Sequence, residues 1–261
     1  FRVSMLDWRG ILKESSFSGI ENYVKLFTTD KFYAAVRNTA VLVGFNLPLV
    51  ILGGFFLGFW LNDQRPWVTH ILRVLFFSPA MIAPPGKALI FRGVYHPHGI
   101  LNQVLTIVGL ETLTRTWLND PATALRAVMA IDLWGGTGFF AVLFFAVLSN
   151  VHPELYEAAK IDGADRWQIM RHIAFPLTLN FVGVALTLHF MWLLLGISQN
   201  IELLTKGGPG TTSTNLGYYL FREAFHIKRL GYSQAIGMVI FVIGMTGLII
   251  IRRLTRRTYQ F

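Results

Sequence analysis

Apolar residues in this chain gather into five long stretches, which shorter polar segments separate. An α-helix needs about 20 mostly apolar residues to cross the hydrocarbon core of a membrane, and each stretch meets that length. The pattern therefore predicts an all-α polytopic membrane protein with five spans in this chain. The predicted spans are Asn38–Leu61, His70–Phe91, Ala124–Leu148, Leu177–Ile197 and Ser233–Ile251.

The second stretch differs from the others because it contains Pro79, Pro84 and Pro85. Each proline removes a backbone donor that lipid cannot replace. We therefore expect this helix to be kinked or to be shielded by neighbouring helices. A plain kink in a packed bundle and a kink that lines a transport pathway are both open interpretations.

Composition supports the same class of protein. Hydrophobic residues make up 53% of the 261 positions and charged residues 14%, whereas about a quarter of a soluble domain is charged. The net charge of +9 is typical of basic cytoplasmic loops facing anionic headgroups, so membrane lipid rather than nucleic acid is the expected partner. The chain has no cysteine, which excludes a disulfide framework and a thiolate metal site.

Basic residues in the short polar segments predict the orientation. They fall in three regions, which share one side of the membrane if the five spans alternate, and the positive-inside rule makes that side cytoplasmic. These residues are Arg65, Arg73, Lys160, Arg166, Arg171, Arg252, Arg253, Arg256 and Arg257.

This orientation places Phe1 outside the cell. Residues 1–37 are mixed and polar, and we expect them to form an external segment that follows a first span left out of this numbering. Residues 38–261 are then expected to form the transmembrane domain. On this interpretation the native protein has six spans.

The polar segment 150–176 lies between the third and fourth spans. Pro153 suits the first turn of a helix, and Gly163 suits the left-handed conformation that ends one. Asp165 is expected to cap a second short helix, Arg166–Ile173, and Pro176 to mark the start of the fourth span. On these grounds alone, a plain amphipathic connector at the membrane surface remains an equal alternative.

The spacing inside this segment is more specific. Glu157-Ala158-Ala159, then Gly163, Ile173 and Phe175-Pro176, resembles the EAA loop of binding-protein-dependent ABC importer permeases, with Phe175 in place of the usual leucine. The resemblance implies the type I ABC importer permease fold. It also implies that this loop forms a coupling helix, which docks into a cleft of a cytoplasmic ATPase subunit. The coupling residues would be Glu157, Ala158, Ala159, Asp162, Gly163 and Pro176.

Two external segments resemble carbohydrate-uptake members of that family. They are residues 17–27, Phe-Ser-Gly-Ile-Glu-Asn-Tyr followed by Leu26-Phe27, and residues 204–225, which begin Leu-Thr-Lys-Gly-Gly-Pro. The similarity is to the larger, MalF-like partner of the heterodimeric sugar permeases. It implies a second homologous permease subunit, a dimer of ATPase subunits, an extracytoplasmic solute-binding protein and a carbohydrate-like substrate. The expected location is a bacterial or archaeal plasma membrane, crossed several times.

Candidate substrate contacts come from polar and aromatic residues inside the spans. Asp132 lies mid-span, where a carboxylate is costly and therefore functional by default, and Trp134 follows it closely. The resemblance implies sugar contacts from this helix at Asp132, Gly135, Gly136 and Phe139. In the alternative interpretation the aromatic residues pack against lipid or a neighbouring helix, and Asp132 pairs within the bundle.

The fourth span is expected to supply the second wall of the substrate site. Its candidate residues are Phe190, Trp192, Gln199 and Asn200, although the last two equally suit the external boundary. Family asparagines on this helix are replaced by Leu194 and Ile197, which argues against maltose itself.

Other functions have weaker support. An ion-coupled secondary transporter using Asp132 and His189 as a proton relay leaves the pattern in 150–176 unexplained. A membrane enzyme needs clustered ionisable residues near one membrane face, and the sequence shows none. The Gly207–Thr212 segment lacks the lysine of a phosphate-binding loop, and His96 and His98 lack a third metal ligand. We therefore expect no catalytic residue, metal or cofactor in this chain, with ATP and Mg²⁺ bound by the partner ATPase.

Overall fold

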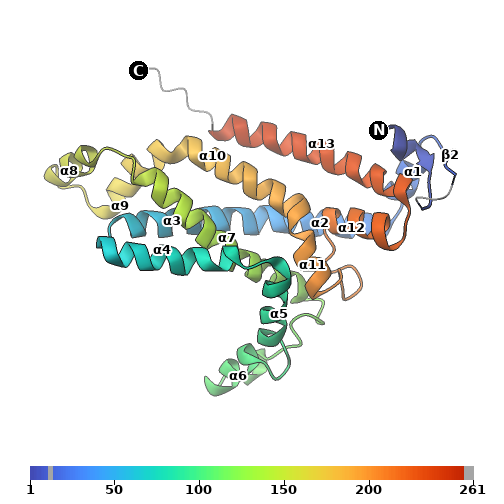
Figure 1. The fold of residues 1–261 in the computed structure, drawn as a ribbon, viewed down its shortest axis with the longest axis horizontal. Helices are drawn as coiled ribbons and strands as arrows, with labels where there is room; N and C mark the ends of the chain where they lie inside the picture. The colour runs from blue at the N-terminus through green and yellow to red at the C-terminus, as the bar shows by residue number, and fades with distance from the viewer. Residues whose placement is uncertain (11–13, 256–261) are drawn as a thin grey trace. The chain divides into compact units, whose positions relative to one another are not determined.

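The computed structural model describes residues 1–10 and 14–255, and helices make up most of them (Figure 1). The α-helices are α1 Glu21–Phe27, α2 Asp30–Val41, α3 Leu47–Asn62, α4 Pro66–Met81, α5 Pro84–Val94, α6 Ile100–Ile107, α7 Ala124–Leu148, α8 Pro153–Ile161, α9 Arg166–Ile169, α10 Phe175–Met191, α11 Ser198–Leu204, α12 Leu216–Phe221 and α13 Leu230–Thr255. Two short strands, β1 Leu6–Asp7 and β2 Ser16–Phe17, pair antiparallel. Single 3₁₀ turns are η1 Arg2–Met5 and η3 Glu111–Leu113, and π-helical turns are η2 Leu42–Asn46, η4 Met170–Ala174, η5 Trp192–Gly196 and η6 Arg222–His226.

Four helices of the described residues are long and apolar enough to cross a membrane. They are Asp30–Asn62, Ala124–Leu148, Arg166–Gly196 and Leu230–Thr255. The pair α4 and α5 meets the same criterion jointly but bends by 96° at the break between the two helices. All five predicted apolar stretches are therefore helical, and the kink expected from the prolines is confirmed. Pro79 lies inside α4, and Pro84 begins α5.

The first and fourth spans begin earlier than the sequence predicted, because π-helical turns join shorter helices into continuous ones. The turn η2 joins α2 to α3, and η4 joins α9 to α10. The predicted cap at Asp165 and the helix start at Arg166 are confirmed, but the helix does not end at Ile173, because it continues through Pro176 into the fourth span. Proline disrupts a helix through its missing N–H and its clash with the carbonyl four residues earlier. The wider π turn directly before Phe175 changes that hydrogen-bond pattern, so the helix continues through Pro176.

The chain divides into two compact units, which we describe separately. The first unit comprises Phe1–Gly44, Ala83–Ile131 and Met191–Thr246. The second comprises Phe45–Ile82, Asp132–Phe190 and the chain from Gly247 onward.

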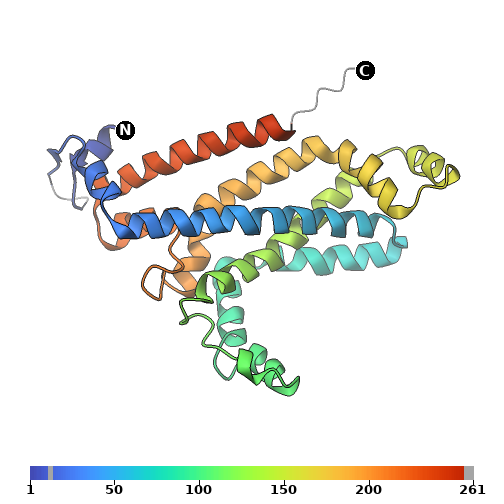
Figure 2. The ribbon, with the colours of Figure 1, turned by 180° about the vertical axis from the view of Figure 1, so that it is seen from behind.

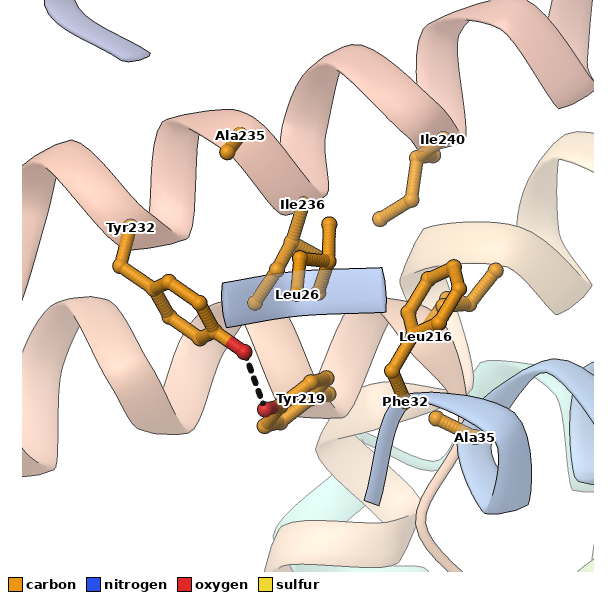
Figure 3. Packing of buried hydrophobic residues seen from close by; sticks show 9 residues of the cluster. All are labelled: Leu26, Phe32, Ala35, Leu216, Tyr219, Tyr232, Ala235, Ile236 and Ile240. Carbon is orange, nitrogen blue, oxygen red and sulfur yellow. Dashed lines mark hydrogen bonds between the residues drawn. The ribbon is translucent and has the colours of Figure 1, made fainter. Parts of the chain in front are cut away.

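The first unit has a hydrophobic core at the meeting of α1, α2, α12 and α13 (Figure 3). The hydroxyl groups of Tyr219 and Tyr232 lie 2.9 Å apart within it, so each phenol finds a polar partner while its ring is buried. Asn38 donates its side-chain amide to the carbonyls of Thr211 and Thr214, both at 2.9 Å, and so ties α2 to the segment before α12. The core residues are Leu26, Phe32, Ala35, Leu216, Tyr219, Tyr232, Ala235, Ile236 and Ile240.

A buried carboxylate borders this core and gives a testable pH dependence. Glu223 is 4% exposed, and its burial raises its pKa above the ordinary value of 4.5, although Arg229 lies 3.8 Å away. The folded state therefore binds the proton more tightly than the unfolded chain, and stability falls as pH rises through the interval between the two pKa values. We expect Glu223→Gln to flatten this decline in thermal-unfolding curves, whereas Asp7→Asn, at an exposed ion pair, should leave it unchanged. An equal decline in wild type and Glu223→Gln would contradict this expectation.

The second unit is organised by direct packing of α3 against α7. Positions four residues apart on α3 meet positions four residues apart on α7, with numbers rising along both helices, so the two helices run parallel. A Cβ atom added at Gly54 would lie 2.7 Å from the Cβ of Phe140, and one at Gly58 would lie 2.8 Å from that of Phe144. Small residues at this spacing allow close backbone approach between membrane helices. In both views α4 lies alongside α3 (Figures 1 and 2).

The parallel packing of α3 and α7 determines how the chain connects the two helices. The ends of α3 and α7 lie together, because Ser149 donates a hydrogen bond of 3.1 Å to Asn62. Arg166, at the start of α9, also pairs with Asp63 at 3.0 Å. The chain between α3 and α7 must therefore return once to the other end of the pair, which agrees with one bent crossing through α4 and α5. The expected cytoplasmic residues Arg256 and Arg257 lie outside the described residues.

Candidate coupling helix and substrate site

No residue of the helix α8 is fully buried. It begins as the sequence predicts, with Pro153 and Glu154 in its first turn, where a missing N–H is harmless and a negative charge is favoured. Figure 1 shows α8 and α9 in the segment that connects α7 to α10.

The turn after α8 is tightly specified. Gly163 has φ +78°, the left-handed conformation expected from the sequence, and its N–H donates to the carbonyl of Lys160 at 3.1 Å. The next N–H, of Ala164, donates to the carbonyl of Ala159 at 2.9 Å. Asp165 and Gln168 then form a reciprocal capping box, with both bonds at 2.7 Å. Fixed hydrogen bonds on both sides of the turn therefore orient α8 relative to α9.

The surface of α8 is unusual for a helix of nine residues. Leu155 is 46% exposed and Ile161 is 86% exposed. Glu157, Ala158 and Asp162 are exposed as well, and Ala159 is half-buried. A short isolated helix is marginal in water, and exposed apolar side chains on one mark a surface that contacts another protein or the membrane. Pro176 lies farther along the chain, within α10.

Asp132 lies in a buried polar cluster of the second unit. The carboxylate is 7% exposed, and its Oδ2 accepts a hydrogen bond of 3.1 Å from Nδ2 of Asn46. His189 of α10 is 3% exposed and places Nε2 at 3.4 Å from the same oxygen, with the Phe140 ring edge-on at 5.6 Å. Asp132 thus has the partners within the bundle that the alternative interpretation expected. Direct contact of Asp132 with a transported solute stays a prediction.

Trp134 lies on a different side of α7 from Asp132. Two residues after Asp132, it points to a different side of the helix and is 42% exposed. It borders an apolar groove of about 600 Å³. The groove is lined by Leu57, Leu75, Phe76, Ser78, Pro79, Leu133, Trp134, Thr137 and Gly138.

The other candidate residues of α7 are packed. Phe139 stacks on Phe77 with ring centroids 6.0 Å apart, and Gly136 lies against Val50. Gly135 is buried. These small and aromatic positions support the helix contacts of the second unit, while Trp134 keeps an open face.

The candidates from the fourth span fall into both units. Phe190 belongs to the second unit, is buried and packs against Gly247 of α13. Trp192, Gln199 and Asn200 belong to the first unit, where Asn200 is buried and the other two are exposed.

The sequence reasoning missed Asn46. The signal was present, because Asn46 is a polar residue in an apolar stretch and stands four residues before Val50, followed at the same spacing by Gly54 and Gly58. That stripe predicts one helix face, and a polar residue on such a face inside a membrane needs a polar partner.

Long apolar helices, an exposed helical turn between two of them and a small-residue interface define a helical protein that crosses a membrane several times. A family model described as "Binding-protein-dependent transport system inner membrane component" matches residues 40–260. The chain belongs to this family. It is therefore a multi-pass plasma-membrane subunit of a transport system and not a member of an enzyme class.

Comparison with individual proteins gives the same result. The chain is 35% identical over 246 residues to "Probable ABC transporter permease protein YurN" of Bacillus subtilis (strain 168), covering 92% of this chain and 83% of that protein. It is 35% identical over 253 residues to "Diacetylchitobiose uptake system permease protein NgcF" of Streptomyces coelicolor, covering 90% and 70%. It also superposes with a TM-score of 0.81 and 25% identity on a chain of a bacterial ABC transporter involved in the import of the acidic polysaccharide alginate, covering 93% of this chain and 85% of that one.

Proposed function

We propose that this chain is the permease subunit of an ATP-driven importer for a sugar or a similar polyhydroxylated solute. An extracytoplasmic binding protein delivers the solute, and a second homologous permease subunit completes the membrane passage. A dimer of cytoplasmic ATPase subunits, which binds ATP and Mg²⁺, drives alternating access through α8. The chain itself supplies no catalytic residue.

The exposed helix α8 carries this proposal. Leu155 and Ile161 present apolar side chains to the solvent, and the Gly163 turn holds the helix in a fixed direction. The spacing of Glu157, Ala158, Ala159 and Gly163 supports an ATPase as the protein that covers this surface. Movement of that partner would then act on α7 and α10, the two helices that flank the segment.

The carbohydrate class rests on two observations. The relative from Streptomyces coelicolor is described as taking up diacetylchitobiose, and the similar solved transporter imports alginate, so both handle molecules rich in hydroxyl groups. In this chain the exposed face of Trp134 offers a surface on which a sugar ring can stack.

The experiment that tests the coupling role is reconstitution of the complex in vesicles with Glu157→Lys. Reversing a charge in a docked surface costs several kcal/mol, so we expect ATP-driven uptake to fall about tenfold or more while membrane insertion is unchanged. The variant Glu111→Lys reverses an exposed charge in η3, outside the segment 150–176, and serves as the control. Normal uptake by Glu157→Lys at normal expression would refute the coupling role. Uptake by this polypeptide alone, driven by an ion gradient, would refute the importer assignment.

A second experiment tests the substrate helix. We expect Asp132→Ala and Trp134→Ala to lower the rate of uptake while the complex still assembles. Trp60→Ala, at another partly exposed tryptophan on a span, is the control for general loss of packing. Unchanged transport kinetics in both α7 variants would remove this helix from the substrate site.

A further inference from the structure

A pocket of about 380 Å³ with a mixed polar and apolar lining lies beside α8 in the second unit, apart from the groove at Trp134. Its walls come from the end of α3, from α8 and from the start of α9. It is lined by Phe59, Asn62, Asp63, Tyr156, Lys160, Ala164, Arg166 and Ile169.

The pocket uses a different face of α8 from the one offered to the ATPase. Tyr156 and Lys160 stand one helical turn apart and border the pocket. Leu155, Ala158 and Ile161 repeat at three-residue spacing on another face and are exposed. The coupling role therefore leaves the Tyr156 and Lys160 face without a function.

Three hydrogen-bond donors line the pocket, the cationic groups of Lys160 and Arg166 and the Tyr156 hydroxyl, beside the carboxylate of Asp63. Arg166 pairs with Asp63 at 3.0 Å, and its guanidinium has five N–H donors, more than one carboxylate occupies. The Lys160 ammonium forms no ion pair or hydrogen bond within residues 1–10 and 14–255. The Tyr156 hydroxyl is buried without a hydrogen-bond partner among the same residues, and burial raises its pKa, so it keeps its proton. An anion entering here would satisfy all three groups.

The position of the pocket suggests which anion this is. Phe59 and Asn62 lie where the first membrane-crossing helix ends, and Arg166 lies where the fourth begins. Trp167 stacks on Phe56 with centroids 6.4 Å apart and an interplanar angle of 8°, and both rings are exposed. Exposed aromatic rings at helix ends are typical of the headgroup level of a membrane, and the cytoplasmic leaflet is rich in anionic lipid.

We propose that this pocket binds the phosphate of an anionic phospholipid, with Lys160, Arg166 and the Tyr156 hydroxyl as donors. The acyl chains would lie against the exposed Phe56 and Trp167 rings. A bound headgroup would link α8 to the ends of α3 and α9, and so brace the helix from the side opposite its docking face.

The test uses the assembled transporter in nanodiscs of phosphatidylcholine mixed with phosphatidylglycerol, followed by native mass spectrometry of the retained lipid. We expect Lys160→Gln to lower retention of phosphatidylglycerol about fivefold, the effect of one basic charge beside an anionic surface. Tyr156→Phe should lower it about tenfold, since the hydroxyl would donate to a charged group. Arg171→Gln removes an exposed basic charge that does not line the pocket and should retain wild-type binding.

Three outcomes would overturn the proposal. Unchanged retention in both Lys160→Gln and Tyr156→Phe would show that the lipid binds elsewhere. Displacement of the lipid by inorganic phosphate would show a site for the free anion. If Lys160→Gln and Tyr156→Phe retained the lipid but lost the co-purified ATPase, the pocket would belong to the interface between this chain and the ATPase. Lipid retention in Leu155→Ser separates this proposal from the coupling role, because Leu155 lies on the docking face and does not line the pocket.

Discussion

Gly163→Pro is expected to abolish ATP-driven uptake while the permease still inserts into the membrane. Gly163 holds φ at +78°, whereas proline fixes φ near −65°, so the turn after α8 cannot form in its present shape. The hydrogen bonds from Gly163 and Ala164 to the end of α8 would be lost with it. The docking face would then point away from its partner. ATP hydrolysis and uptake, measured together in vesicles, should become uncoupled.

Gly109→Pro is a matched control for that experiment. Gly109 has φ +77°, and a Cβ there, as at Gly163, would meet no atom within 4 Å. The two substitutions therefore impose the same backbone conflict at two different turns. If both variants lost uptake equally, the effect would be general misfolding. Retained uptake in Gly163→Pro would show that the turn does not orient a coupling surface.

Gly58→Val is expected to prevent assembly of the transporter. A Cβ at position 58 would lie 2.7 Å from the carbonyl oxygen of Ala141 and 2.9 Å from the backbone nitrogen of Phe145, and neither backbone atom can move aside. Such overpacking costs about 1–3 kcal/mol, a large part of the stability of a folded unit. Size-exclusion chromatography and thermal unfolding of the detergent-solubilised complex should show the loss.

Gly44→Val provides the comparison, because Gly44 lies on the same membrane-crossing helix and its Cβ would meet no atom within 4 Å. We expect this variant to assemble normally. A stable complex with Gly58→Val, or equal damage from both substitutions, would mean that close contact between α3 and α7 is not what holds the unit together.

The hydrophobic pattern predicted the spans because length and apolar composition follow directly from the thickness of the membrane. The ends of α8 were also predictable, since Pro153 and Gly163 have strong local preferences that tertiary packing did not override. The resemblance of the segment 150–176 to the EAA loop identified the family, which local conformational preferences alone could not do. These features depend on residues close together in the chain.

Features that depend on contacts between distant residues were harder to predict. The helix continues through Pro176 because of the π turn Met170–Ala174, and no residue type signals such a turn. The partnership of Asp132 with Asn46 depends on the register of two helices, and a single sequence does not state that register. The prolines marked the place of the break between α4 and α5, but they did not predict its angle of 96°.

The close parallel contact between α3 and α7 makes the two helices move together as one rigid element. One end of the pair carries Ser149, next to the segment that leads into α8, and Asp132 lies about 25 Å away along the same helix. Glycine contacts between those points leave no room for one helix to turn or slide on the other. A displacement applied at the α8 end would thus arrive at Asp132, Asn46 and the facing His189 almost undiminished.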